Sequence, residues 1–218
     1  FAKADALAIE TRIPEQAVVQ EVIRRRAIDP AGRPLAKQLP PKLYKRVVKQ
    51  MKAYRMPMQY FEPFEPWYVA MSLELVAYQK LGLAADSGVE PRLLADAART
   101  GKRIAALEGF EEQIGYFDTL PPQWQVDLLR ATLEETGSAN RRIDDLVSAW
   151  SRGDVARLAK AMNDSLGRMP ELRAVLLDRR NARWAEWISG RMARLGKVFV
   201  AVGAGHLGGK DSVQDYLA

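Results

Sequence analysis

The sequence contains no cysteine and a single histidine, and both shortages restrict its chemistry. Without cysteine the chain forms no disulfide, no thiolate zinc site and no cysteine nucleophile. It also has no apolar run near the roughly 20 residues that a membrane-spanning helix requires. Its first residues, FAKADALAIE, carry charges within the apolar stretch, unlike a signal peptide. We therefore expect no transmembrane segment in this chain.

Neither sign of charge dominates, because the chain has 33 Lys and Arg residues and 27 Asp and Glu residues, for a net charge of +6. The basic clusters VIRRRAIDPAGR, NRRIDD and DRRNAR are each diluted by nearby acids. Proteins that bind nucleic acids more typically show one concentrated basic stripe or a known motif. We therefore expect a solvated basic surface and no nucleic-acid partner.

Three short apolar runs predict buried strands, at residues 4–10, 102–108 and 197–203. None alternates apolar with polar residues, which is typical of strands covered on both faces. Long helical stretches separate them, so crossover connections and parallel pairing follow. The 48% apolar content of 218 residues suits one domain with a real core. The predicted fold is α/β and mostly helical, with a small, largely parallel buried sheet surrounded by amphipathic helices.

Helical periodicity is visible in both halves of the chain. In the second half, apolar residues recur at i, i+3, i+4 and i+7 over 143–150 and again over 155–162, with Asp154 as an N-cap between them. Further helices are predicted to begin at Pro122 and near Pro170. Helices in the first half are predicted at about 15–26, 41–54, 66–81 and 90–100.

Polar side chains follow each of the three predicted strands. Glu10 ends the first run, Glu108 ends the second, and His206 lies three residues beyond Gly203 in a glycine-rich turn. Functional groups gather beyond the carboxyl ends of parallel strands. Two carboxylates and an imidazole can bind a hard or zinc-like cation, or can form an acid–base pair. Taken singly, a strand-end glutamate is more often a helix N-terminal acid or a surface charge.

The helix after Pro170 directs an arginine toward the core. Steps of 100° per residue place Arg180 near the centre of an apolar face and Asn181 near its margin. An arginine in a core is costly unless it meets an anion, although its long stem could also reach solvent. We expect Arg180 to meet a buried carboxylate or a substrate anion, with Glu108 as the obvious partner. The apolar face comprises Leu172, Val175, Leu176, Trp184, Trp187 and Ile188.

Five segments in order, ADALAIE, GVEPRLLADAARTGKRIAALE, ALEGFEEQIGYFDTLP, DRRNARWAEWI and VFVAVGAGHLGGKDSV, resemble successive blocks of the TraB/GumN family, which is related to the Tiki proteins. The resemblance covers nearly the whole chain. It implies that Gly203 and His206 form the second of two GxxH motifs. It further implies that Glu108 is the acid of the middle block, and that Arg180 and Asn181 are the separate Arg–Asn pair of the family.

The resemblance implies a metal-dependent, peptidase-like hydrolase that uses a divalent Mn, Co or Zn ion and a peptide or small-molecule substrate. His206, Glu108 and Glu10 are then the candidate metal ligands, and Glu108, Arg180, Asn181 and His206 the candidate catalytic residues. Arg180 would stabilise an oxyanion or bind a substrate carboxylate. The alternative is a non-catalytic module for haem, iron or another small molecule on the same scaffold. Exported or membrane-tethered relatives favour the bacterial envelope over the cytoplasm.

The sequence departs from the family pattern at both ends. The first GxxH motif is absent, and relatives usually continue beyond SVQDYLA. We therefore interpret residues 1–218 as one TraB/GumN-like domain that lacks its N-terminal GxxH segment and its extreme C-terminal segment. Without the first histidine, we expect this polypeptide to bind metal weakly or not at all and to be inactive by itself.

Overall fold

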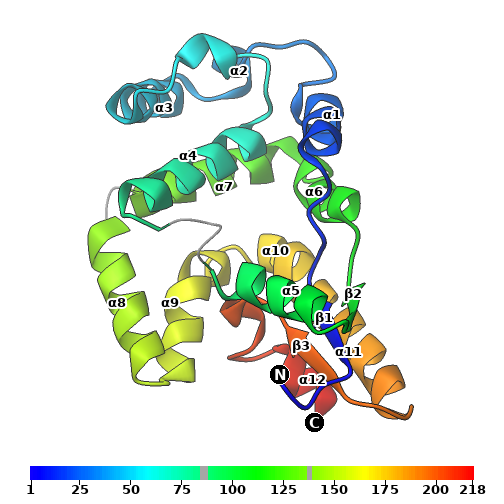
Figure 1. The fold of residues 1–218 in the computed structure, drawn as a ribbon. Coiled ribbons are helices and arrows are strands. Elements are labelled where there is room, and N and C mark those ends of the chain that lie inside the picture. The colour runs from blue at the N-terminus through cyan, green and yellow to red at the C-terminus, as the bar shows by residue number, and fades with distance from the viewer. Residues whose placement is uncertain (84–87, 137–138) are drawn as a thin grey trace. The chain divides into compact units, whose positions relative to one another are not determined.

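The computed structural model describes residues 1–83, 88–136 and 139–218 (Figure 1). The chain divides into two compact units, each assembled from segments distant in sequence. The sheet unit consists of Phe1–Arg12, Ala85–Phe110 and Arg142–Ala218. The helical unit consists of Ile13–Ala84 and Glu111–Arg141.

The sheet unit contains three parallel strands: β1 (Ala6–Ile9), β2 (Arg103–Ala106) and β3 (Val198–Ala201). Their order is β2-β1-β3, so β1 lies in the centre and pairs with both neighbours in parallel. The predicted strands and their parallel pairing are confirmed. Each strand is shorter than its apolar run at both ends.

Burial differs between the central strand and the edges. All four residues of β1 are buried, as expected for a strand covered on both faces. Leu7 and Ile9 pack with Ala97 and Leu93 of α5 (Val89–Arg99), so Ala6 and Ala8 face the opposite side by alternation. The expectation of burial on both faces is wrong for β2 and β3, which are partly exposed. As edge strands, each has only one neighbour among the described residues.

The sheet unit also holds most of α8 (Ala139–Ser151) and all of α9 (Val155–Gly167). The Arg157 N–H donates to the Asp154 carboxylate over 3.0 Å, which confirms Asp154 as the cap of α9. The next helix runs from α10 (Pro170–Arg173) through a π-helical turn, η3 (Ala174–Asp178), into α11 (Arg179–Met192). After β3 come the short turn η4 (Ala204–His206) and α12 (Val213–Leu217).

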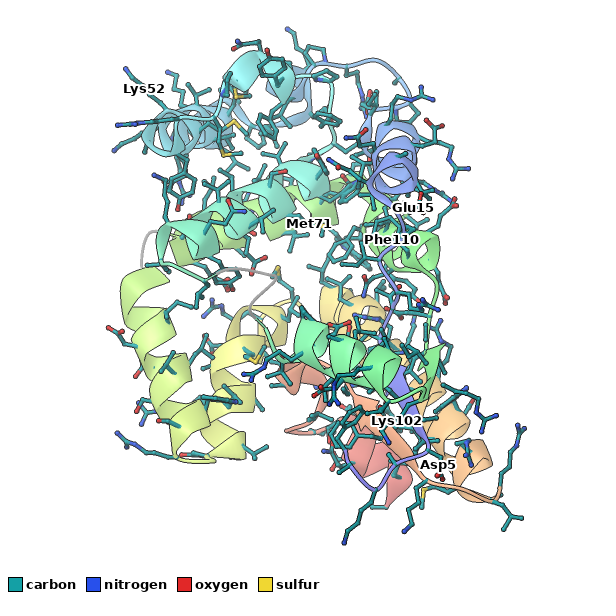
Figure 2. All side chains as sticks on the ribbon, viewed as in Figure 1. Asp5, Glu15, Lys52, Met71, Lys102 and Phe110 are labelled. Carbon is teal, nitrogen blue, oxygen red and sulfur yellow. The ribbon has the colours of Figure 1, made fainter. Side chains whose placement is uncertain are left out.

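Two charged residues tie the strands together where they begin. The Asp5 carboxylate, just before β1, accepts the backbone N–H of Lys197, just before β3, over 2.6 Å. The Lys102 ammonium, just before β2, donates to the backbone carbonyl of Ala4. Figure 2 labels Asp5 and Lys102 at this end of the sheet. The amino edge is thus held by ordinary structural contacts, and the remaining polar strand-end residues lie at the carboxyl edge.

The helical unit contains α1 (Gln16–Ala27), α2 (Leu35–Gln38), α3 (Pro41–Tyr54), η1 (Met58–Tyr60), α4 (Pro66–Lys80), most of α6 (Phe110–Asp118) and α7 (Pro122–Thr136). Helices α4 and α7 pack along each other (Figure 1). Pro41, Pro66 and Pro122 stand at the first helical positions, where a missing N–H costs nothing. For this reason the predicted starts of these helices are nearly correct.

The core of the helical unit is aliphatic. Its buried members are Leu35, Leu39, Leu43, Val47, Met51, Val69, Ala70, Leu73, Val126, Leu129 and Leu133.

Arg26 binds two acids of α6, Glu111 over 2.8 Å and Asp118 over 3.0 Å. Glu111 follows the middle-block glutamate, Glu108, by three residues, but it takes part in a structural ion pair. Among the described residues, no helix has the length and apolar composition that crossing a bilayer requires.

Candidate functional site

The carboxyl ends of the three strands lie at one edge of the sheet, because the strands are parallel and in register. The Glu108 N–H donates to the Glu10 carbonyl over 2.9 Å, which places these two glutamates beside each other. The Gly203 N–H donates to the Glu10 carboxylate, which connects the end of β1 to the turn after β3. The predicted meeting of the strand ends at one edge is confirmed.

Arg180 joins the two glutamates in a buried ion cluster. Its Nη2 donates to Glu108 Oε1 over 2.6 Å and to Glu10 Oε2 over 3.1 Å, and its Nε donates to Glu108 Oε2 over 3.1 Å. Its Nη1 donates to the Leu176 carbonyl over 2.8 Å. Glu108 and Arg180 are only 4% and 7% exposed, so their charges need close partners, and Arg183 lies 3.6 Å from Glu108 as a second, more exposed cation. The predicted pairing of Arg180 with Glu108 is confirmed, and Glu10 is a second partner.

The π-helical turn before α11 changes which residues face the core. The 100° steps place Val175 and Leu176 on the buried face, whereas the structure buries Leu176 and Leu177 and leaves Val175 partly exposed. A π turn contains one more residue per turn than an α-helix. The residues after it are therefore rotated about the helix axis relative to the positions that uniform 100° steps predict. With that rotation Arg180 and Asn181 are both buried, and Asn181, placed at the margin by the 100° steps, is 2% exposed. π turns occur frequently at functional sites.

Asn181 fixes the tautomer of His206. The Asn181 Nδ2 donates to the backbone carbonyl of Asp211 over 2.7 Å, which leaves its Oδ1 as the atom facing His206. Because an amide oxygen only accepts, His206 Nδ1 must carry the proton of the 2.6 Å bond between them. Nε2 then has a lone pair, and no described residue bonds to it. Neutral imidazoles held in this way by a second group are typical of metal ligands and of bases.

The surroundings of His206 keep it neutral. Burial of the ring and the nearby positive charge of Arg180 lower the pKa of His206 from its usual 6.5 to about 3. The Trp184 ring contacts both groups, with its centroid 4.5 Å from the His206 ring centroid and 4.8 Å from the Arg180 guanidinium carbon. The indole N–H of Trp184 is buried and has no hydrogen-bond partner within the described part of the chain. This donor and the His206 Nε2 lone pair are thus two unused polar groups in one cluster.

The turn that carries His206 packs tightly on α9. The Asn163 amide donates to the Gly205 carbonyl over 2.8 Å. A Cβ at Gly208 would lie 2.7 Å from the Cβ of Ala159, which is too close for any side chain. Gly208 is therefore needed for the close approach of the two backbones. Asn163 and Trp184 are functional candidates that the sequence analysis missed, because helical periodicity presents them as ordinary helix residues.

One further acid lies near the carboxyl edge. Glu90 stands in the first turn of α5, and burial of its carboxyl together with the negative charge of Glu10 raises the pKa of Glu90. In the sequence analysis this residue belongs only to the block GVEPRLLADAARTGKRIAALE. Its place beside Glu10 depends on how α5 packs on β1, which no local pattern reveals.

The predicted metal ligands differ in how well they suit an ion. In the ranges 1–83, 88–136 and 139–218, no group of three His, Asp or Glu side chains is arranged to hold a metal. The carboxylates of Glu10 and Glu108 bind the Arg180 guanidinium, which already takes the place of a cation between them. His206, neutral and with its Nε2 lone pair unused, fits the role of one ligand. The carboxylates fit the role of an anchor for Arg180.

The fold, together with Glu10, Glu108, Arg180 and His206 at the strand ends, defines an α/β protein with a polar site at the carboxyl edge of a small parallel sheet. The sequence profile of the TraB/PrgY/gumN family matches residues 1–218, and the chain belongs to this family. The chain is 31% identical over 151 residues to the uncharacterized protein YbaP of Escherichia coli K12, and equally to YbaP of Shigella flexneri. These matches cover 69% of this chain and 55% of each relative, so the chain spans about half the length of these proteins. No solved structure matches it.

Proposed function

We propose that this chain carries part of the active site of a metal-dependent hydrolase, peptidase-like in its chemistry, in which His206 is a metal ligand through Nε2. The observation that carries the proposal is the state of His206. Its Nδ1–H is fixed by Asn181 over 2.6 Å, its ring is buried, and its pKa is lowered to about 3, so a neutral nitrogen is available at any physiological pH. A metal ligand needs this protonation state, because only neutral imidazole coordinates.

The other residues have supporting roles in this proposal. Glu108 and Glu10 hold Arg180 at the carboxyl edge, and Arg180 in turn disfavours protonation of His206. The Trp184 ring packs against both His206 and Arg180 and so helps to hold the two groups in place. A bound Mn, Co or Zn ion would supply Lewis-acid activation of water or of a carbonyl group. The location in the bacterial envelope stays a prediction.

A single histidine makes the test direct, because the imidazole nitrogens of the whole chain give one pair of ¹⁵N resonances. We expect Zn²⁺ to shift the Nε2 resonance while Nδ1 stays protonated, and Co²⁺ or Mn²⁺ to broaden the same signals. Weak affinity is expected, because His206 is the one ligand assigned here. His206→Ala should reduce the heat of metal binding measured by calorimetry. Arg99→Ala, on the exposed surface of α5, serves as the control.

A Zn²⁺ titration that leaves Nε2 unchanged, or calorimetry that gives equal heats for the parent and His206→Ala proteins, would contradict the proposal. The same sample tests the alternative of a haem- or iron-binding module, which the available Nε2 also suits. A Soret band that appears with haem and is lost in His206→Ala, without any effect of Zn²⁺, would favour that alternative.

A further inference from the structure

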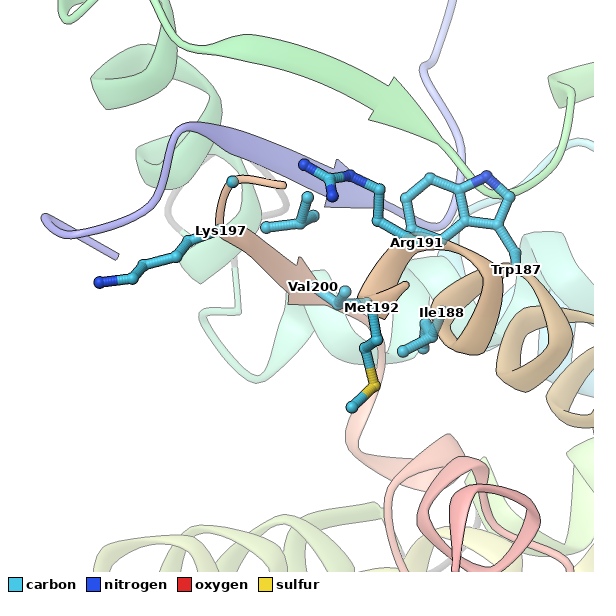
Figure 3. A pocket seen from close by; sticks show the side chains of 8 residues that line it. Trp187, Ile188, Arg191, Met192, Lys197 and Val200 are labelled. Carbon is cyan, nitrogen blue, oxygen red and sulfur yellow. The ribbon is translucent and has the colours of Figure 1, made fainter. Parts of the chain in front are cut away.

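A groove lies along the outer side of β3, away from the cluster at the carboxyl edge. It has a volume of about 320 Å³ and is lined by α11, by the connection after it and by β3. Figure 3 shows Ile188 and Met192 close to Val200, on the side of β3 that faces away from β1. Met192 is 75% exposed, so apolar surface of α11 adjoins the outer edge of β3.

The hydrogen-bonding pattern of β3 leaves one backbone edge unused. The Lys197 carbonyl accepts the Ala6 N–H, so Lys197 and, by alternation, Phe199 and Ala201 direct their backbone groups toward β1. The N–H and C=O groups of Val198 and Val200 then point outward. No described strand pairs with β3 on that side. A row of free donors and acceptors of this kind selects an extended backbone as its partner.

The lining specifies the side chains of such a partner. Ile188 and Met192 form an apolar wall on the α11 side of the strand edge, and Trp187 lines another part of the same groove. Residues of an added strand alternate between its two faces, so every second side chain would meet this wall. The groove therefore favours apolar residues at alternate positions of the incoming segment.

The charges of the groove distinguish between possible occupants. Arg191 and Lys197 line it, and the nearest acid is Asp5, whose carboxylate lies beside Gly196 and accepts the Lys197 N–H over 2.6 Å, so basic groups outnumber acidic ones here. A second copy of the chain would bring another Arg191 and another Lys197 to the same junction, with a net charge of +6 on each copy. An acidic segment would instead neutralise the two cations.

We propose that the outer edge of β3 is a docking site for an extended peptide segment that has apolar residues at alternate positions and acidic residues at its ends, bound by strand addition. The proposal does not depend on metal binding or on hydrolysis at the carboxyl edge. It assigns a binding role to Val198, Val200 and Met192, which the cluster around His206 does not use.

The test uses the whole chain and a fluorescein-labelled peptide, Glu-Glu-Val-Thr-Ile-Thr-Val-Glu-Glu, followed by fluorescence anisotropy. We expect saturable binding that weakens at least about tenfold, or about 1.4 kcal/mol, when alternate peptide amides are N-methylated. We expect a similar loss when the four glutamates are replaced by lysines. N-methylation removes the donors that would pair with β3, and the lysine peptide reverses the charge match.

Two variants locate the binding to this edge. Val200→Pro removes an outward N–H and leaves the bonds between β1 and β3, as edge strands tolerate proline at such positions. Met192→Glu places an acid in the apolar wall. Both substitutions should weaken the binding of the acidic peptide at least about tenfold. Leu195→Glu is the matched control, because Leu195 is 99% exposed but is not part of the groove lining. Circular dichroism confirms that each variant is folded.

Several results would overturn the proposal. These are the absence of saturable binding, equal binding of the acidic and lysine peptides, or binding that survives both Val200→Pro and Met192→Glu. Sedimentation analysis that shows a dimer of the parent chain, broken by Val200→Pro, would assign the edge to a second copy instead.

Discussion

The amide oxygen of Asn181 and Nδ1 of His206 lie 2.6 Å apart, and the other end of the same amide is bound by the Asp211 carbonyl. One asparagine thereby fixes the orientation and the tautomer of the only imidazole in the chain. Asp211 itself has φ of 61°, an uncommon value for a residue other than glycine, so a left-handed backbone position supports the arrangement.

Asn181→Asp should raise the pKa of His206, because a carboxylate acceptor stabilises the charged imidazolium form that the amide does not. Asn181→Ala should remove the tautomer preference without adding charge. The ¹⁵N shifts of the single histidine, followed as a function of pH, report both effects. A pKa of His206 that is the same in the Asp variant and the parent chain would show that Asn181 does not control the ring.

The stability of the parent chain should fall as the pH decreases from 6.5 toward 3. The folded-state pKa of His206 is about 3, below its usual 6.5, so the unfolded chain binds the extra proton in this interval. The contribution of His206 is therefore complete above pH 6.5 and is lost progressively below it. It amounts to at most about 5 kcal/mol, at 1.36 kcal/mol per pKa unit. Urea unfolding at several pH values measures it.

The carboxylates also titrate at low pH, so the informative quantity is the difference between the parent chain and His206→Gln. The variant should lose stability less steeply between pH 6.5 and 4. Identical slopes for the two proteins would mean that His206 is not buried in its neutral form.

Arg180→Met should lower the free energy of unfolding by about 3–5 kcal/mol, because it leaves the buried Glu108 carboxylate without its main partner. Adding Glu108→Leu should restore part of this loss, since a buried pair replaced by apolar groups is often tolerated. Arg99→Met is the control, because its pair with Asp96 is exposed and contributes less than about 1 kcal/mol. Equal costs for the two arginine substitutions in urea unfolding would refute the buried cluster.

Gly208→Ala should destabilise the chain by about 1–3 kcal/mol, because the new methyl group would overlap the Ala159 side chain. Gly190→Ala, within α11, meets no atom within 4 Å and should instead stabilise by up to about 1 kcal/mol, the usual difference between glycine and alanine in a helix. The double variant Gly208→Ala with Ala159→Gly should recover some of the loss. Thermal unfolding distinguishes these three outcomes, and a neutral Gly208→Ala would show that the turn does not pack on α9.

Much of the fold follows from local pattern. The apolar runs near 4–10, 102–108 and 197–203 are too short for helices, and the helical stretches between them dictate parallel crossovers. Prolines mark the helix starts at Pro41, Pro66 and Pro122. The meeting of Glu10 and Glu108 at one edge then follows from parallel geometry alone. The apolar runs overestimate the burial of β2 and β3, because a run of apolar residues does not reveal which strand is central in the sheet.

The strands, most helices, the edge that carries the polar residues, and the need of Arg180 for an anion all follow from the amino-acid sequence. How these groups are used depends on the packing of the elements. In the packed chain Arg180 binds two glutamates, a π turn brings Asn181 inward to His206, and the Trp184 ring contacts both His206 and Arg180. Periodicity reports which side of an element is apolar. Hydrogen bonds between residues distant in sequence depend on how the elements pack, so no local pattern encodes them.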